Sequence, residues 1–339
     1  MVRVGIIGLG GMGNMHFGIY EKLPGARVVA LADRESDRLK PGQSSLAINI
    51  GAGGAVIDPS RHKTYADADK LIRDPDVQVV DICLPTFLHA EYMIKAIEAG
   101  KHVMCEKPMA LNPQECQRVL DALTGKKVEL MIAQCIRFWP EYAYLKETVE
   151  SGRLGRVLAA EFWRGGSPPE WTWQNWMKDV KRSGGAILDL HVHDVDFVHY
   201  LLGRPRAVCS TGARGFSGGY DAVETVYLYE SKAAVRAGAN MTLPAAFGFE
   251  MRYVVTFEKG CLAYSSNSKP TLAEMTGSSK THPELKQTDG YHEELAYLVR
   301  CIEKGEAPAV VTPESAAFSI KLAAAEIKSV ETGRVVELH

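Results

Sequence analysis

A glycine motif near the amino terminus restricts the folds open to this chain more than any other feature. Residues Gly8-Leu9-Gly10-Gly11-Met12-Gly13 match G-x-G-x-x-G, follow a strand-like apolar run and open a helical pattern. In that context the first glycine allows a tight turn, the second lets the backbone approach a pyrophosphate, and the third lets the helix pack closely on the strand. The amides at the helix amino terminus then stabilise phosphate charge. The motif predicts a dinucleotide site in a Rossmann-type domain.

The first 135 residues alternate apolar, β-branched runs with stretches of helical periodicity. Near-continuous apolar strands alternating with helices are typical of a parallel sheet covered on both faces. Strands are predicted at residues 2–8, 27–33, 77–85, 102–106 and 128–134, and helices at residues 14–23, 68–73, 89–99 and 113–123. Residues 40–62 interrupt this rhythm, and their glycine, serine and proline content predicts a surface loop with a short helix at residues 44–50.

The pattern changes after Cys135, where several runs alternate with period two. Strands are predicted at residues 157–163, 207–211, 223–229, 234–241, 250–257 and 261–265, and helices at residues 141–151, 291–304 and 313–332. Such alternation suits an open sheet that buries one face on helices. We therefore predict an α/β protein. Its N-terminal Rossmann domain, a doubly wound parallel sheet, spans residues 1–135, and a C-terminal α+β domain with an open, largely antiparallel sheet spans residues 136–339, with a last helix that can pack back on the first domain.

Charge and composition exclude several classes of function. The chain has 39 Lys and Arg against 41 Asp and Glu, a formal net charge of −2, so neither a nucleic-acid partner nor a charged membrane surface is indicated. No apolar run reaches the roughly 18 residues of a membrane span, and the first residues lack the pattern of a secretory signal. The seven cysteines are scattered without a C-x-x-C pair, which is typical of reduced cysteines in a cytoplasmic protein.

Asp33 ends the second predicted strand, about 20 residues after the glycine motif. A carboxylate at this position accepts hydrogen bonds from ribose hydroxyls and repels a 2′-phosphate, which favours NAD over NADP as the cofactor. Arg34 can pair with a 2′-phosphate or stack on adenine, so NADP stays possible. Further cofactor-binding candidates share the carboxyl edge of the predicted sheet: Leu84, Pro85, Thr86, His89, Glu106 and Lys107. His89 begins a helix and either caps it or contacts the cofactor.

Two segments offer groups for acid–base catalysis. Glu106-Lys107-Pro108 ends a strand at the carboxyl edge, where Lys107 is expected near the reactive ring of the cofactor and can help deprotonate a substrate hydroxyl. In the second domain Asp189, His193 and Asp196 follow one another at i, i+4 and i+7 and are expected on one helix face. A carboxylate beside an imidazole fixes its tautomer and raises its basicity. Lys107, Asp189 and His193 are therefore the candidate catalytic residues.

The second of these segments also offers metal ligands. The candidates are His191, His193, Asp194, Asp196 and His199. On a helix His191 points away from His193, and no second cluster completes a coordination shell. We therefore predict no metal.

These motifs together resemble the Gfo/Idh/MocA family, and the resemblance covers essentially the whole chain. It rests on the glycine motif, Asp33, Pro85 with His89, Glu106-Lys107-Pro108, Arg137-Phe138 before Pro140, Ser151-Gly152-x-x-Gly155, and Ser183-Gly184-Gly185 before Asp189-x-x-x-His193-Asp194. The resemblance implies a catalytic set of Lys107, Asp189 and His193, and it allows a cis peptide bond before Pro108. It also implies reversible hydride transfer between nicotinamide C4 and a ring carbon of a sugar or cyclitol, and a homodimer or homotetramer that associates through the open sheet face.

A loop over residues 168–176 holds three of the five tryptophans. Flat aromatic surfaces pack on the C–H faces of ring sugars, so these side chains either contact a substrate or anchor the loop. The candidate substrate-binding residues are Trp173, Trp176, Arg137, Arg164 and Tyr291. Plain structural roles for them stay equally open.

The leading hypothesis is an NAD(P)-dependent dehydrogenase that transfers a hydride between nicotinamide and a ring hydroxyl carbon of a sugar, cyclitol or related polyol. One alternative is NAD-dependent glycoside cleavage by transient oxidation and elimination, which would release a sugar without net NADH. The other is a non-catalytic dinucleotide-binding sensor. A sensor has no need of Lys107, Asp189 and His193 together, whereas this chain carries all three.

Overall fold

The structure of the protein is a computed structural model that describes residues 1–41 and 55–338. The short helix predicted at residues 44–50 lies outside the described residues, as does most of the loop predicted over residues 40–62. The described parts of that loop, residues 40–41 and 55–62, contain no regular helix or strand. None of the described helices combines the length and the apolar content that are needed to cross a membrane.

The chain forms two compact units. Unit 1 consists of Met1–Cys135 together with Tyr291–Ala317, and unit 2 consists of Ile136–Gly290 together with Phe318–His339. Tyr291–Ala317 thus belongs to unit 1, although its place in the chain assigned it to the second predicted domain. Packing rather than chain order decides to which unit a segment belongs.

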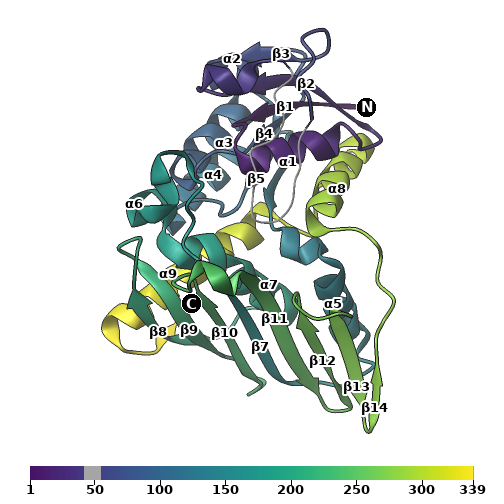
Figure 1. The fold of residues 1–339 in the computed structure, drawn as a ribbon, viewed down its shortest axis with the longest axis vertical. Coiled ribbons are helices and arrows are strands. Elements are labelled where there is room, and N and C mark those ends of the chain that lie inside the picture. Colours follow the sequence, from purple (N-terminus) through teal and green to yellow (C-terminus); the bar gives the residue numbers. More distant parts are fainter. Residues whose placement is uncertain (42–54, 339) are drawn as a thin grey trace. The chain divides into compact units, whose positions relative to one another are not determined.

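Unit 1 is built on a parallel six-stranded sheet (Figure 1). Its strands are β1 (Val2–Ile7), β2 (Ala26–Ala32), β3 (Lys63–Tyr65), β4 (Val79–Ile82), β5 (His102–Glu106) and β6 (Leu130–Ala133). The order is β3-β2-β1-β4-β5-β6 and every neighbouring pair is parallel, which confirms the predicted doubly wound Rossmann fold. β3 was not predicted, because its three residues are exposed or half-buried and form no apolar run.

The helices of unit 1 are α1 (Gly11–Tyr20), α2 (Ala68–Arg73), α3 (His89–Glu98), α4 (Pro113–Leu123) and α8 (Gly290–Lys304). α4 begins as predicted: the Asn112 side chain accepts the Glu115 N–H at 2.9 Å, and Pro113 occupies the first helical position. α1 begins at Gly11, three residues earlier than predicted. The glycine motif therefore forms the junction between β1 and α1.

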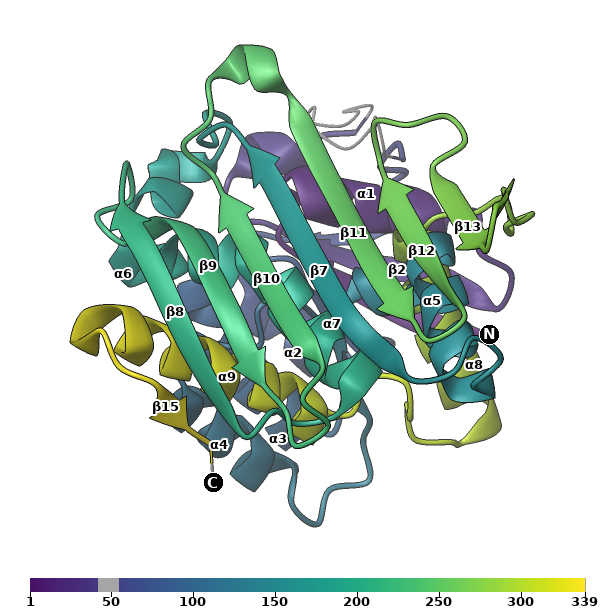
Figure 2. The ribbon, with the colours of Figure 1, turned by 90° about the horizontal axis from the view of Figure 1, so that it is seen from below.

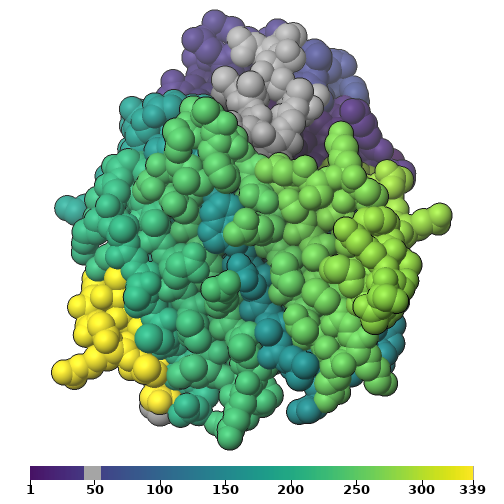
Figure 3. Space-filling view, turned by 60° about the horizontal axis from the view of Figure 1, so that its bottom comes forward, coloured from purple at the N-terminus to yellow at the C-terminus, as the bar shows by residue number. Residues whose placement is uncertain are grey.

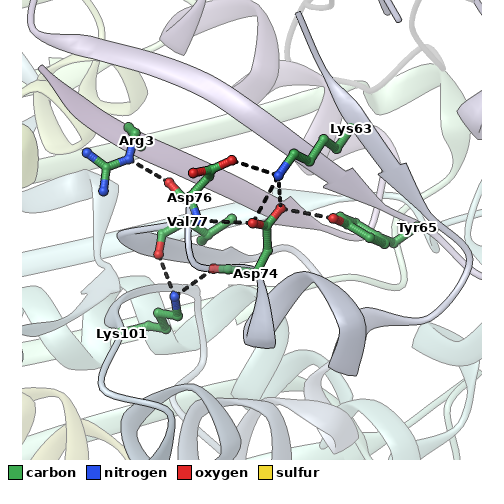
Figure 4. Close-up of polar contacts among 7 residues, drawn as sticks. All are labelled: Arg3, Lys63, Tyr65, Asp74, Asp76, Val77 and Lys101. Atoms are coloured by element: carbon green, nitrogen blue, oxygen red, sulfur yellow. Dashed lines mark hydrogen bonds and ion pairs between the residues drawn. The ribbon is translucent and has the colours of Figure 1, made fainter.

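A polar network holds together the amino ends of these strands (Figure 4). Asp74 is only 5% exposed and accepts hydrogen bonds from Lys63 Nζ at 3.1 Å and from the Tyr65 hydroxyl at 2.9 Å. Lys63 also pairs with Asp76 at 2.7 Å, and Lys101 Nζ donates to the Asp74 carbonyl at 2.8 Å. Ligands of open α/β sheets bind at the carboxyl ends of the strands. We therefore assign a structural role to this network at the opposite edge.

Unit 2 is built on a nine-stranded sheet. Its strands are β7 (Val157–Gly166), β8 (Ala207–Arg214), β9 (Tyr220–Leu228), β10 (Ala234–Asn240), β11 (Phe249–Phe257), β12 (Gly260–Ser265), β13 (Leu272–Thr276), β14 (Ser279–Thr281) and β15 (Val336–Glu337). They run in the order β14-β13-β12-β11-β7-β10-β9-β8-β15. β7 and β10 are parallel and the other neighbours are antiparallel, so the prediction of a largely antiparallel sheet is confirmed.

Helices cover one face of this sheet (Figure 2). These are α5 (Pro140–Ser151), α7 (Val192–Leu202) and the part of α9 (Pro313–Thr332) that belongs to unit 2. Aromatic rings fill the layer between sheet and helices: the ring centroid of Tyr142 lies 4.8 Å from that of Phe197 and 5.1 Å from that of Tyr253.

The other face of the sheet is open to solvent, with side chains of β7 to β11 at the surface (Figure 3). Along β9 buried and accessible residues alternate, as expected for a sheet with one solvated face. Val226 and Val254 are 46% and 42% exposed on this face. Exposed apolar side chains grouped on one face are a common feature of protein interfaces.

Candidate active site

The glycine motif leaves space for a dinucleotide at the carboxyl end of β1. Gly8 has a φ of +92°, and a Cβ there would lie 2.5 Å from the Cys83 carbonyl oxygen. A Cβ at Gly13 would lie 1.8 Å from the Gly8 carbonyl oxygen, so only glycine permits this approach of α1 to the turn. A Cβ at Gly10 would have no described atom within 4 Å. The turn is therefore closed on the protein side and open at Gly10, where backbone amides can receive a pyrophosphate.

Asp33 follows β2 and lies beside this turn. Its carboxylate, in a residue only 6% exposed, accepts the Leu9 N–H at 2.7 Å and the Glu35 N–H at 2.8 Å. Arg38 also donates to it at 3.2 Å, a contact that the sequence pattern did not reveal. Arg34 is exposed. Asp33 thus links the carboxyl ends of β1 and β2, and its charge lies where the ribose of a dinucleotide is expected.

His89 is buried between two backbone carbonyl groups. Nδ1 lies 2.7 Å from the carbonyl oxygen of Pro108, Nε2 lies 2.7 Å from that of Leu84, and the residue is only 1% exposed. The residue before α3 is Leu88, and no side chain caps the helix there. His89 therefore connects the loop Leu84-Pro85-Thr86, in which Thr86 is 2% exposed, to the turn after β5.

The dipeptide Glu106-Lys107 lies at the carboxyl end of β5. Lys107 is half-buried, and the peptide bond before Pro108 is cis, as the resemblance allowed. Glu106 is 6% exposed and accepts the Lys107 N–H on Oε2 at 3.1 Å. Burial alone would raise the pKa of the Glu106 carboxyl, but His16 and the charge of Lys107 outweigh burial and lower it. Glu106 is therefore held as a carboxylate beneath the lysine.

A buried cluster that sequence reasoning missed lies beneath this dipeptide. His16 Nδ1 lies 2.9 Å from Asp81 Oδ2 and 3.4 Å from Cys83 Sγ, and His16 Nε2 lies 3.2 Å from Glu106 Oε1. Among the described residues, the side chains of His16, Asp81 and Cys83 lie close enough together to bind one metal ion. Those atoms contact one another at hydrogen-bonding distances, which accounts for the cluster without an ion. The residues come from α1, from β4 and the residue after it, and from β5, so chain spacing gave no signal.

Asp189 and His193 lie in unit 2, where a glycine turn leads into an irregular helix. Residues Ile187–His191 form a π-helical turn that continues into α7. Asp189 is 8% exposed and His193 is half-buried. A π-turn changes the number of residues per turn, so the shared face expected for Asp189, His193 and Asp196 stays a prediction. Such turns are frequent at functional sites.

The two arginines predicted to bind substrate form buried ion pairs. Arg137 binds the Asp196 carboxylate through Nε at 2.8 Å and through one terminal nitrogen at 2.7 Å. Arg164 binds the Asp194 carboxylate in the same way, with both contacts at 2.7 Å. Burial alone would raise the pKa of Asp196, but the charge of Arg137 holds it well below its ordinary value. The structure thus gives both arginines partners within unit 2 that spacing did not reveal.

His191 and His199, two of the side chains weighed as metal ligands, also have protein partners. His191 Nε2 lies 3.1 Å from Glu326 Oε2, and the Tyr227 hydroxyl donates to the same carboxylate at 2.7 Å. His199 Nε2 lies 2.9 Å from the Ser319 hydroxyl. Asp194 and Asp196 are bound to arginines, and Asp196 shares the Ser319 hydroxyl with His199.

The tryptophan loop and Tyr291 are accessible to solvent. Trp173 and Trp176 are half-buried in a short turn where Gln174 and Asn175 have positive φ. The Arg182 guanidinium lies 5.5 Å from the centre of the Trp173 ring. Tyr291 is half-buried in the first turn of α8, in unit 1. Accessible aromatic surface is therefore present in both units.

Comparison with known proteins decides the family. Residues 2–134 match the model described as "Oxidoreductase family, NAD-binding Rossmann fold", and residues 142–263 match the GFO/IDH/MocA C-terminal domain. The chain belongs to the GFO/IDH/MocA family. Its N-terminal domain is thus an NAD-binding Rossmann domain, and the protein is an oxidoreductase.

This member of the GFO/IDH/MocA family is similar to curated dehydrogenases over most or all of its length. It is 29% identical to the myo-inositol 2-dehydrogenase of Thermotoga maritima, over 100% of this chain and 99% of that protein. It is 31% identical to the levoglucosan dehydrogenase of Pseudarthrobacter phenanthrenivorans, over 77% of this chain and 66% of that protein. A levoglucosan dehydrogenase solved with NADH and levoglucosan has the same fold, with a TM-score of 0.83, 22% identity and 99% of each chain covered.

Proposed function

We propose that the protein oxidises or reduces a ring carbon of a sugar, cyclitol or related polyol, with NAD as the hydride carrier. The observation that carries the proposal lies within unit 1. The glycine turn, Asp33 and Lys107 all follow strands at the carboxyl edge of one parallel sheet, so a dinucleotide site and a basic side chain share that edge. The similarity to inositol and levoglucosan dehydrogenases supports a ring polyol as the substrate.

The residues present fit a dinucleotide. The open side of the turn at Gly10 and the amides that begin α1 would hold the pyrophosphate, and Asp33 would hold the ribose and disfavour a 2′-phosphate. Leu84, Pro85 and Thr86 would line the same edge. When bound, the nicotinamide ring supplies the acceptor for the hydride. The fit favours NAD, while the exposed Arg34 leaves NADP as the second cofactor to test.

Lys107, Asp189 and His193 would together remove the proton of the substrate hydroxyl during oxidation and return it during reduction. His193 would accept that proton as the general base, and Asp189 would fix the tautomer of its imidazole. Lys107 would donate a hydrogen bond to the same oxygen and stabilise the negative charge that develops on it. Trp173, Trp176 and Tyr291 would offer ring faces to the substrate.

The open face of the nine-stranded sheet would join copies of this chain into a homodimer or homotetramer. It combines the exposed Val226 and Val254 with an ion pair between Arg236 and Glu161. A V226D/V254D variant should shift the mass measured by light scattering toward the monomer, and an unchanged mass would exclude this face as the interface. The cytoplasmic location expected from the sequence stays a prediction.

The proposal is tested by a substrate panel. Purified protein is mixed with NAD or NADP and with inositols, aldoses, anhydrosugars or glycosides, and reduced cofactor is followed by absorbance. Reduced NAD should form with one class of polyol, and a K107A variant should lose this activity. Release of a free sugar without reduced cofactor would replace the proposal with glycoside cleavage. Full turnover by K107A would remove the assigned role of the lysine.

A further inference from the structure

Two buried histidines contact the turn Glu106-Lys107-Pro108 from different sides. His16, on α1, is 0% exposed, and its Nε2 lies 3.2 Å from Glu106 Oε1. His89, the first residue of α3, is 1% exposed, and its Nδ1 lies 2.7 Å from the Pro108 carbonyl oxygen. His16 therefore contacts a side chain of the turn that carries Lys107, and His89 contacts its backbone.

Both ring nitrogens of His16 face carboxylates. Nδ1 lies 2.9 Å from Asp81 Oδ2, opposite the contact of Nε2 with Glu106. Burial alone would lower the pKa of His16, but the neighbouring Cys83 and Asp81 raise it well above its ordinary value. Tyr20 also faces this cluster from α1 and contacts Asp81. Nδ1 has hydrogen-bond geometry toward Asp81, whereas Nε2 and Glu106 Oε1 lie at ion-pair distance only. A protonated His16 places its positive charge between these two carboxylates.

Both ring nitrogens of His89 face backbone carbonyl oxygens. Nε2 lies 2.7 Å from the Leu84 oxygen, and Nδ1 lies at the same distance from the Pro108 oxygen. Carbonyl oxygens only accept hydrogen bonds, so both contacts are favourable only when both nitrogens carry a proton. The charged groups that face His89 are Glu106 and Lys107. Burial lowers the pKa of His89, although both carbonyl contacts and the charge of Glu106 act to raise it.

Each histidine also belongs to a segment that would hold the dinucleotide. His16 lies on α1, three residues after Gly13, and His89 binds the carbonyl of Leu84 in the loop after β4. We propose that His16 and His89 are positioning residues that fix the Lys107 turn relative to these dinucleotide-binding segments. This inference rests on the proposed function in so far as it treats Lys107 as catalytic.

The test compares the variants H16Q and H89Q with D74N. Glutamine keeps a donor but cannot donate from two opposite ring positions. Asp74 is also buried, at 5% exposed, but lies at the opposite edge of the same sheet, so D74N reports what a purely structural loss does. In H16Q and H89Q, kcat should fall on the order of 100-fold, the effect expected when a catalytic group moves by about 1 Å. KM for NAD should change much less. D74N should lower the thermal midpoint and leave kcat unchanged.

A second measurement is independent of activity. The Lys107 N–H donates to Glu106 Oε2 in the described structure, so its hydrogen exchange reports directly on the turn. We expect faster exchange in H16Q and H89Q, with no change in D74N. If H16Q does not fold, E106Q replaces it, because it keeps the shape of the side chain and removes the charge that faces His16.

The outcomes separate the two proposals. If K107A is inactive while folded H16Q and H89Q keep both kcat and slow Lys107 exchange, the positioning role is wrong and the proposed function stands. If K107A retains full turnover, the catalytic role of Lys107 is lost, and exchange at its amide still decides whether the histidines hold the turn. Nitrogen-15 spectra of the imidazoles complete the test: a neutral His16 at neutral pH would contradict the paired contacts.

Discussion

Arg137 and Asp196 form a two-point ion pair inside unit 2, with the Asp196 carboxylate also accepting the Ser319 hydroxyl at 2.7 Å. Arg137 is 4% exposed and Asp196 is 0% exposed, so the pair is removed from water. In that setting each charge depends on the other, because a lone buried ion has lost its hydration without replacement. The pair joins the turn before α5 to α7, the helix that carries His193.

Removal of one member of this pair should strongly destabilise the protein. We expect D196A to reduce the free energy of unfolding by about 3–5 kcal/mol, since it leaves the Arg137 charge buried and unpaired. Urea unfolding measures the effect. E258Q serves as the matched control, because Glu258 pairs with the exposed Arg156 at the surface, and its midpoint should stay close to that of the parent. Equal urea midpoints for D196A and E258Q would contradict a stabilising role for the buried Arg137–Asp196 pair.

Alanine substitutions in the glycine motif should separate folding from binding. G13A places a Cβ against the Gly8 carbonyl and should cost about 1–3 kcal/mol of stability, or more, although alanine favours helices. G10A meets no described atom within 4 Å and should leave stability unchanged while it weakens NADH binding. Thermal unfolding and NADH fluorescence titration measure the two effects. Tight NADH binding by G10A would show that the dinucleotide does not pass this residue.

The charge of Asp33 should decide between the two cofactors. D33N keeps an oxygen that can accept the Leu9 N–H but removes the repulsion of a 2′-phosphate. We expect the ratio of NADPH to NADH affinity to rise roughly tenfold or more, as the loss of one nearby charge predicts. Calorimetric titration with both cofactors measures this ratio. No change in this affinity ratio would mean that the Asp33 carboxylate stabilises the glycine turn but does not select the cofactor.

Asp74 should make the stability of unit 1 sensitive to acid. Burial alone would raise its pKa, but the Asp76 N–H and Lys63 outweigh burial and lower it. A carboxyl whose pKa is lower in the folded protein stabilises it above the unfolded pKa, and this contribution disappears as the pH falls through the folded pKa. The difference in stability between the parent protein and D74N should therefore shrink from pH about 7 to pH about 3. A constant difference in urea midpoints over that range would be inconsistent with this shift.

The fold could be predicted because its signals are local. The glycine motif, the apolar strands and the cap at Asn112 each lie within a few residues, and the structure confirms the sheets that they predict. β3, β13, β14 and β15 gave no such signal. β3 and β14 are short and accessible, so their pairing depends on a neighbouring strand rather than on their own residues.

The partners within the candidate site could not be predicted, because they come from distant parts of the chain. His16 and Asp81 are 65 residues apart and meet only when α1 packs on β4. Arg137 and Asp196 are 59 residues apart. The π-turn at Ile187–His191 also has more residues per turn than an α-helix, and spacing rules for α-helices do not predict such a turn.

Transfer of deuterium from a ring carbon to nicotinamide tests the proposed reaction most directly. The protein is incubated with NAD and the polyol identified by the panel, deuterated at its carbinol carbons. Hydride transfer predicts reduced nicotinamide that carries deuterium at C4, with its formation lost in K107A. Product formation in which deuterium never appears in the reduced cofactor would contradict a dehydrogenase and require a different reaction for this site.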